Sequence, residues 1–237
     1  MVKIKVVLPV PHDIWNRKIE ESCRKVADRE TYIEVVNTEK GAETLEGFYY
    51  GSFAEVDTIK RIVDAEKQGF DAVVVWCTAN VGVEASREVV SIPVVGIMEA
   101  AHLMAMLIGR KFSELVSVEH VVIRHWRNAR IFGSKSKLAS VRVIGLPIKE
   151  LHKDLDQTFK KMYEAGKKAI EEDKADVLVL GCGAMLGITD RLQKKLGVPV
   201  LEPGESGIKV AEMLVKLGLS HSKKGYLPLI EGIEISE

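Results

Sequence analysis

Cysteine is scarce in this sequence, and the three that occur stand far apart, at positions 23, 77 and 182. No two of them form a Cys-x-x-Cys pair, so the sequence predicts neither a disulfide framework nor a structural zinc site. It also contains no GxGxxG fingerprint, no P-loop and no close group of His, Asp and Glu residues. We therefore expect a protein that works without a metal ion or an organic cofactor.

Net charge is lacking as well, because 34 Lys and Arg residues balance 34 Asp and Glu residues among the 237. Such a chain has no basic field to attract nucleic acid or an anionic membrane surface. Its apolar runs are shorter than the roughly 18 residues that a membrane span needs, and the N-terminal run is too short for a signal peptide. We expect a cytoplasmic protein that binds a small molecule, with neither nucleic acid nor membrane as a partner.

What the sequence does carry is one stretch that occurs twice. Residues 69–82 read GFDAVVVWCTANVG and residues 174–187 read KADVLVLGCGAMLG, each an apolar run that ends in a cysteine and a turn of small residues. Matched residues stand 105 positions apart here and 106 apart further on: Asp71 and Asp176, Cys77 and Cys182, Gly82 and Gly187, Pro93 and Pro199, and Glu99 and Glu205. A duplicated unit explains this register better than chance does, and it predicts two pseudo-symmetric lobes.

Strands are expected to alternate with helices along the chain. The expected strands lie at 4–8, 31–36, 72–76, 93–97, 115–118, 141–144, 177–180 and 199–201, and the helices between and after them end near 28, 68, 90, 109, 130, 172 and 217. This alternation predicts βαβ units, and hence an α/β fold in which each lobe is a parallel sheet flanked by helices. We assign residues 1–98 and 206–237 to the first lobe and residues 99–205 to the second.

Both repeated cysteines directly follow a predicted strand, at the sheet edge where ligands of open parallel sheets bind. A helix N-terminus there would lower a thiol pKa, and the backbone N–H groups of Thr78 and Gly183 would be the natural donors to a ligand. If pseudo-symmetry brings the two edges face to face, a small molecule between them has one thiol on each side. A thiolate could then remove a proton from one face of a carbon while the other thiol protonates the opposite face, which inverts its configuration. We therefore predict that Cys77 and Cys182 are the catalytic pair.

Four further residues are candidates for substrate contact, each with a plainer alternative: Asn80, Phe48, Tyr49 and His12. Asn80 stands in a turn, where its side chain could instead satisfy its own backbone. Phe48 and Tyr49 belong to an expected loop at 41–51 and could cap the substrate or simply pack that loop. His12 follows the first strand at the expected ligand edge and could form a polar wall there, but a loop histidine is the simpler explanation. The third cysteine, Cys23, lies on the apolar face of a predicted helix, so we expect it in the core.

Charged residues outside the repeated stretches have structural explanations. The run RHWRNAR at 124–130 could suggest nucleic-acid binding, but without net basic charge we interpret it as a solvated helix face. Glu99 and Glu205 stand where helices are expected to begin, and there their negative charge would interact favourably with the positive end of the helix dipole.

Several segments together resemble the aspartate/glutamate/hydantoin racemase superfamily, and hydantoin racemases most closely: TLEGFY at 44–49, the turn at Cys77, PVVGIMEAA at 93–101, GRKFS at 109–113, ASVR at 139–142, LGCGAM at 180–185 and LGL at 217–219. The resemblance covers nearly the whole chain. It implies two Rossmann-like lobes with the active site between them, and cofactor-independent racemisation by Cys77 and Cys182. The implied substrate is a 5-substituted hydantoin or an amino acid such as aspartate or glutamate.

Other functions stay open at this level. The first strand is followed by PVPHD where hydantoin racemases usually carry an asparagine-threonine motif, and CTANVG at 77–82 is closer to the cysteine turns of amino-acid racemases. A decarboxylase or cis–trans isomerase of the same superfamily is a further alternative, although a decarboxylase would be expected to lack one of the two cysteines. A small-anion binding protein could use the same strand-end donors without reactive thiols. We also expect a homo-oligomer, with a subunit number that the sequence does not specify.

Overall fold

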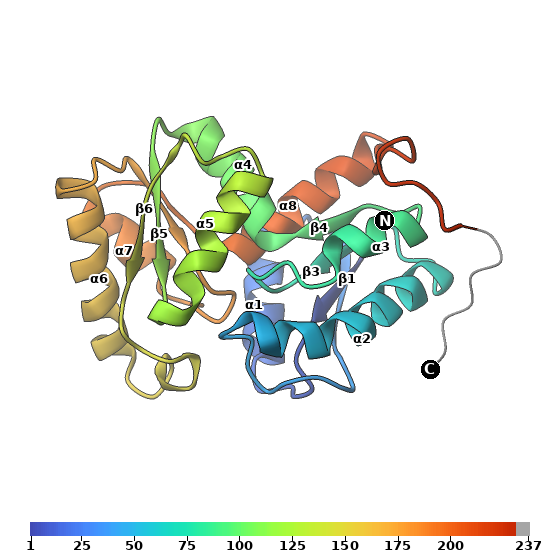
Figure 1. The fold of residues 1–237 in the computed structure, drawn as a ribbon, viewed down its shortest axis with the longest axis horizontal. Coiled ribbons are helices and arrows are strands. Elements are labelled where there is room, and N and C mark those ends of the chain that lie inside the picture. Colours follow the sequence, from blue (N-terminus) through green and yellow to red (C-terminus); the bar gives the residue numbers. More distant parts are fainter. Residues whose placement is uncertain (231–237) are drawn as a thin grey trace.

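Two four-stranded parallel sheets form the framework of the protein in a computed structural model, which describes residues 1–230 (Figure 1). Residues 231–237 of the expected tail lie outside the described part. The first sheet has the order β2-β1-β3-β4, with β1 Lys3–Leu8, β2 Tyr32–Asn37, β3 Ala72–Val75 and β4 Val94–Gly96. The second has the order β6-β5-β7-β8, with β5 Phe112–Val116, β6 Leu138–Val143, β7 Val177–Leu180 and β8 Val200–Leu201. The predicted α/β fold with two lobes is confirmed.

Helices flank both sheets, so that neither sheet is left as an open layer. Their bounds are α1 Asn16–Val26, α2 Phe48–Lys67, α3 Val83–Val89, α4 Ile97–Ile108, α5 Val122–Ile131, α6 Leu155–Glu171, α7 Thr189–Leu196 and α8 Pro203–Lys216, with short 3-10 turns η1 Glu119–Val121 and η2 Ile148–Glu150. Figure 1 shows the lobes side by side, with α6 at the outer end of one and α2 along the other. Helix α4 packs against both α8 and β7, and so it joins the two lobes.

The repeat seen in the sequence has the same structural role in each lobe. Asp71, just before β3, accepts a 2.7 Å hydrogen bond from the backbone N–H of Lys3. Its counterpart Asp176, just before β7, accepts hydrogen bonds from the N–H groups of Arg110 and Lys111 at 2.9 and 3.0 Å. Each aspartate therefore binds the chain as it enters the strand next to its own, which fixes the register of the strand that leads to a cysteine.

Helix α8 returns to the first sheet. Its residues Ile208 and Ala211 are fully buried in one cluster with Val74 and Trp76, and the helix also packs against α1. This packing supports our proposal that the segment after residue 205 belongs with the first lobe, and we keep the proposed boundaries after residues 98 and 205.

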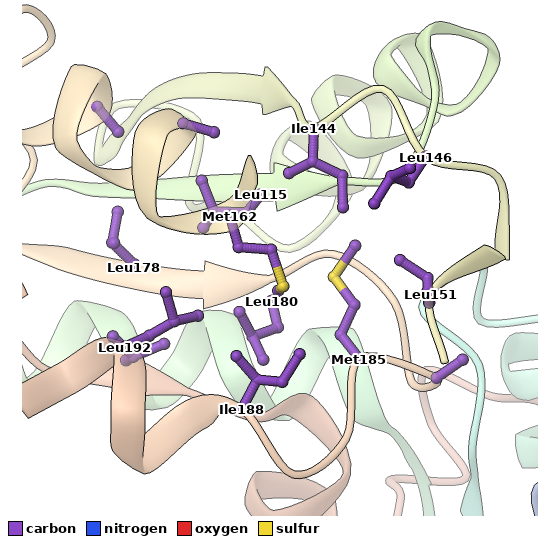
Figure 2. Close-up of a cluster of buried hydrophobic side chains, with 14 of the residues drawn as sticks. Leu115, Ile144, Leu146, Leu151, Met162, Leu178, Leu180, Met185, Ile188 and Leu192 are labelled. Carbon is purple, nitrogen blue, oxygen red and sulfur yellow. The ribbon is translucent and has the colours of Figure 1, made fainter. Parts of the chain in front are cut away.

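The core of the second lobe lies between its sheet and α6 and α7 (Figure 2). Leu178 and Leu180 of β7 meet Met162 of α6 there, and Met185 enters the same cluster from the turn after Cys182. Met185 is 1% exposed. It is the repeat counterpart of Asn80, so one cysteine turn is anchored by an apolar side chain where the other carries an amide.

Three elements begin well before the expected residue: α2, β5 and β6, the last at Leu138 and not at residue 141. Helix α2 begins at Phe48 and not near residue 53, so Phe48 and Tyr49 lie in its first turn and the expected 41–51 loop is shorter. Gly47 has an extended backbone, with φ 172° and ψ 156°, and the helix begins directly after it. Three aromatic residues, a type that favours strands, therefore lie at the start of a helix. Strand β5 starts at Phe112, which is 1% exposed, and not at residue 115.

Candidate active site

Cys77 and Cys182 line one cavity between the two lobes. The cavity measures about 90 Å³. One water molecule needs about 10–15 Å³ of such volume, so the cavity can hold a small molecule such as a five-membered ring with its carbonyl oxygens. Apolar side chains make up much of its wall, namely Leu8, Val10, Trp15, Leu45, Trp76, Val121 and Ile148. The two cysteines predicted from the repeat are therefore brought together at one small site.

The two cysteine turns have matching local geometry. In each turn the backbone N–H two residues after the cysteine donates to the sulfur over 3.4 Å, from Ala79 to Cys77 and from Ala184 to Cys182. The N–H groups of the intervening residues, Thr78 and Gly183, have no acceptor within residues 1–230. These two predicted donors are therefore available to a ligand, and both residues line the cavity.

Hydrogen bonds across the lobes hold the two turns against each other. The indole Nε1–H of Trp76 donates to the carbonyl oxygen of Gly183 at 3.0 Å. The carbonyl oxygen of Thr78 in turn accepts from the Asn128 side chain at 2.9 Å. Trp76 and Thr78 are each at most 8% exposed to solvent, so these hydrogen bonds are shielded from competing water.

Burial sets the acidity of both thiols, contrary to the expected lowering by a helix N-terminus. Burial raises the pKa of Cys77, and the Ala79 N–H and the charge of Arg124 only partly oppose this. Burial, with smaller contributions from the charges of Cys77, Glu46 and Glu202, raises the pKa of Cys182 to about 12. The prediction failed because helices α3 and α7 begin only at Val83 and Thr189, beyond the turns. Both cysteines are therefore thiols in the free protein at neutral pH.

Helix α5 contributes two charged or polar residues to the cavity that the sequence analysis did not select. Arg124 and His125 line it and are 6% and 1% exposed, so the interpretation of 124–130 as a solvated face is wrong for these residues. Arg124 donates a 2.6 Å hydrogen bond to the carbonyl oxygen of Leu45, and His125 donates from Nδ1 to Glu114. Apolar residues at 121, 129 and 132 are the signal that could have identified this buried side, since with 125 they recur at helical spacing.

The other predicted contact residues do not line the cavity. Asn80 adopts a left-handed backbone with φ 52° and borders a neighbouring polar pocket that also contains Phe48. The Phe48 ring lies 4.9 Å from the Arg124 guanidinium, so its connection to the site runs through that side chain. Tyr49 is 70% exposed, and His12 Nε2 lies 3.0 Å from the carbonyl oxygen of Glu43.

The remaining expectations concern single residues and partners. Cys23 is buried in the core, as predicted. Glu99 and Glu205 stand in the first turns of α4 and α8, also as predicted. Within residues 1–230, no group of three or more His, Cys, Asp or Glu side chains is arranged to hold a metal ion, and no helix there is long and apolar enough to cross a membrane.

Comparison with known proteins gives the same family as the sequence motifs. The family model for Asp/Glu/Hydantoin racemase matches residues 16–211. A hydantoin racemase from Paenarthrobacter aurescens is 32% identical over 224 residues, which are 94% of this chain and 94% of that protein.

Two solved structures share the whole fold. The allantoin racemase from Pseudomonas fluorescens has a TM-score of 0.95 and 33% identity, with 99% of this chain and 100% of that chain covered. The allantoin racemase from Klebsiella pneumoniae also has a TM-score of 0.95, at 30% identity, with 100% and 97% covered. The resemblance inferred from the sequence is thereby confirmed, and the chain belongs to the Asp/Glu/hydantoin racemase family of isomerases.

Proposed function

We propose that the protein racemises 5-substituted hydantoins by proton transfer between Cys77 and Cys182, without a metal or an organic cofactor. The observation that carries this proposal is the placement of two thiols, from equivalent turns of opposite lobes, on one small cavity. A substrate between them would present opposite faces of its C5 carbon to the two sulfurs. Such an arrangement suits removal of a proton on one side and delivery on the other.

The reaction then proceeds in two proton transfers. The thiolate of one cysteine takes the C5 proton, so that an S–H bond forms and the C–H electron pair moves onto the adjacent carbonyl oxygen as an enolate. The pair returns to C5 as the other thiol gives up its proton there, and this sulfur becomes the thiolate. The free N–H groups of Thr78 and Gly183 would bind the substrate's oxygens during these steps.

Charge makes Cys77 the more acidic thiol of the pair and hence the base once one of the two ionises. Arg124 opposes the effect of burial at Cys77, whereas the charges around Cys182 add to it. We therefore infer that Cys77 ionises first while Cys182 keeps its proton, and that one substrate enantiomer binds to this form.

The hydantoin ring is favoured as substrate by the cavity and by the relatives. The matched proteins are named hydantoin racemase and allantoin racemase, and allantoin is itself a hydantoin with a ureido group on C5. Racemisation of aspartate or glutamate is the second candidate. It is less well supported because a free amino acid brings a carboxylate, and the only Arg or Lys that lines the cavity within residues 1–230, Arg124, already donates to Leu45.

The test is incubation of single enantiomers of allantoin, 5-benzylhydantoin, aspartate and glutamate in heavy water. NMR follows loss of the α-proton and polarimetry follows optical rotation, with enzyme-free samples to correct for spontaneous exchange of the hydantoins. We expect both signals to decay faster with enzyme for the hydantoins. Decay at the enzyme-free rate for every hydantoin would refute the proposal.

The reactivity of the thiols distinguishes the racemase from the non-enzyme alternative, a small-anion binding protein. Ligand-protected alkylation of Cys77, the more acidic thiol, by iodoacetamide is expected for the racemase, whereas a binding module needs no reactive thiol. We also propose that the protein is a cytoplasmic homo-oligomer, and light scattering coupled to gel filtration would detect a single species of one chain if the oligomer proposal is wrong.

A further inference from the structure

A carboxylate lies fully buried behind the cavity wall. Glu114, on β5, is 0% exposed, and both its oxygens are bound by imidazoles. Oε1 lies 3.0 Å from Nε2 of His102, and Oε2 accepts a short hydrogen bond from Nδ1 of His125. No Lys or Arg within residues 1–230 contacts it. The two imidazoles are therefore its only polar side-chain partners in that part of the chain.

The far side of this cluster is rigidly held. His102 is 0% exposed, and its Nδ1 lies 2.7 Å from the hydroxyl oxygen of Ser134. The rings of Phe112 and Phe132 pack against His102 edge to face, with centroids 4.8 and 5.4 Å away. A buried side chain with all its polar atoms bonded and its ring faces packed has one orientation. Glu114 is thus fixed by a partner that cannot move.

The other imidazole connects this cluster to the cavity. Nδ1 of His125 is hydrogen-bonded to Glu114, and the His125 ring lines the same cavity as the two cysteines. Its Nε2, on the opposite edge of the ring, has no hydrogen-bond partner within residues 1–230. The cluster therefore ends in one free polar atom at the site of the proposed chemistry.

The charge of the cluster decides what that atom can do. Burial alone would raise the pKa of Glu114, but the charge of His125 and the hydrogen bonds from both imidazoles hold it well below its usual range. A buried carboxylate is stable only beside a compensating positive charge. Of the two imidazoles, His125 is the one that reaches the cavity, where a proton can arrive. With a proton on each nitrogen, its Nε2–H is a donor.

We propose that His125 is a third catalytic group, whose Nε2–H donates a hydrogen bond to the carbonyl oxygen next to the reacting carbon, and that Glu114 and His102 position it. The inference rests on the proposed racemase function. As a cysteine removes the proton, the C–H electron pair moves onto this oxygen, and the hydrogen bond from His125 strengthens as the negative charge grows. His125 keeps its proton throughout. The charge leaves the oxygen when the second thiol protonates the carbon.

The experiment compares His125→Gln with the wild-type enzyme. The glutamine amide can still donate to Glu114 but cannot also present a donor to the cavity. We expect kcat for a single hydantoin enantiomer to fall by about 10²–10³, the usual effect of losing one oxyanion donor. Binding of 5,5-dimethylhydantoin, which has no C5 proton to lose, is expected to weaken less than about tenfold. Arg130→Gln, an exposed change on the same helix, is the matched control and should retain full activity.

A purely structural role would weaken binding of 5,5-dimethylhydantoin and kcat in the same proportion, and that result would overturn the proposal. So would a folded His125→Gln variant with unchanged kcat. If His125→Gln does not fold, Glu114→Gln decides: it keeps an acceptor for Nδ1 but removes the charge that supports the second proton, so kcat should fall at least about tenfold. Unchanged kcat in that variant contradicts the role of His125. Absence of any racemisation by the wild-type enzyme would instead refute the proposed function, and this inference with it.

Discussion

The hydroxyl of Thr78 donates a 3.0 Å hydrogen bond to the carbonyl oxygen of Gly181, 103 positions further along the chain. The bond joins the turn that contains Cys77 to the residue just before Cys182. Each partner is buried, so water does not compete for it. The separation of the two sulfurs is therefore set partly by one hydroxyl group, in addition to the packing of the lobes.

Replacement of Thr78 by valine tests this link, since valine keeps the shape and removes the hydroxyl. The carbonyl oxygen of Gly181 would be left buried without its donor, which costs about 1–3 kcal/mol. We expect the free energy of unfolding to fall by that amount in urea titrations, and kcat to fall as well because the turns are less well fixed. Thr78→Ser, which retains the donor, should lose less of both. Equal behaviour of the two variants would show that the bond has no role.

Substitution of each cysteine of the proposed catalytic pair separates the two halves of the proposed reaction. In Cys77→Ser and Cys182→Ser, a hydroxyl of much lower acidity replaces a thiol, so racemisation should fall by about 10²–10⁴ in either variant. The remaining cysteine could still exchange the proton of the one enantiomer that faces it. NMR in heavy water should therefore show exchange from only one enantiomer in each variant, and from opposite ones in the two. Cys23→Ala, a change in the core, should leave kcat unaltered. Racemisation at the wild-type rate in either serine variant would exclude the two-base mechanism.

The fold and the meeting of the two cysteines at one cavity were predictable because their signals lie in one continuous stretch. A buried strand, a cysteine and a small-residue turn occur twice at a nearly fixed spacing, and parallel sheets bring such strand ends to a common edge. The aspartate that precedes each strand was part of the same repeat, and its backbone hydrogen bonds explain why it was retained in both copies.

The rest of the site was not predictable because its residues are outside the repeat. His125 and Arg124 are polar residues in a basic run, whose composition favours exposure to solvent. Only contacts with distant segments bury them, with Glu114 of β5 for His125 and with Leu45 for Arg124. Glu114 is the one charged residue of β5, yet nothing in the sequence identifies the imidazoles that satisfy it. The acidity of the thiols could not be predicted either. It depends on their burial and on where the next helix begins, and the sequence specifies neither.

Arg124 should influence the two thiols differently, because its charge acts on Cys77. Arg124→Met removes this charge, so the pKa of Cys77 should rise further and alkylation of this thiol by iodoacetamide near pH 8 should become slower. The labelling rate of Cys182 should change little. Arg124→Lys keeps a positive charge and should label at close to the wild-type rate. Mass spectrometry of peptides containing each cysteine gives both rates, and equal slowing at both sites would indicate a general change in access.

A second buried carboxylate, Glu202, caps the N-terminus of α8. Its side chain accepts hydrogen bonds from the N–H groups of Gly204 and Glu205 at 3.0 and 2.8 Å. It is 3% exposed, and burial raises its pKa from 4.5 to about 7 despite these bonds, with the charge of Glu205 adding to the shift.

The stability of the protein should therefore depend on pH through Glu202. Between pH 4.5 and about 7 the folded protein holds a proton that the unfolded chain has lost, so this residue makes the free energy of unfolding fall as pH rises, by about 3 kcal/mol over the window. Glu202→Gln keeps an acceptor for the cap and removes the titration. His152 and His221, with lowered pKa values, act in the opposite direction. The quantity to measure by urea denaturation from pH 5 to 8 is thus the difference between variant and wild type. This difference should grow in favour of the variant as pH rises, and parallel curves would show that Glu202 is ionised throughout.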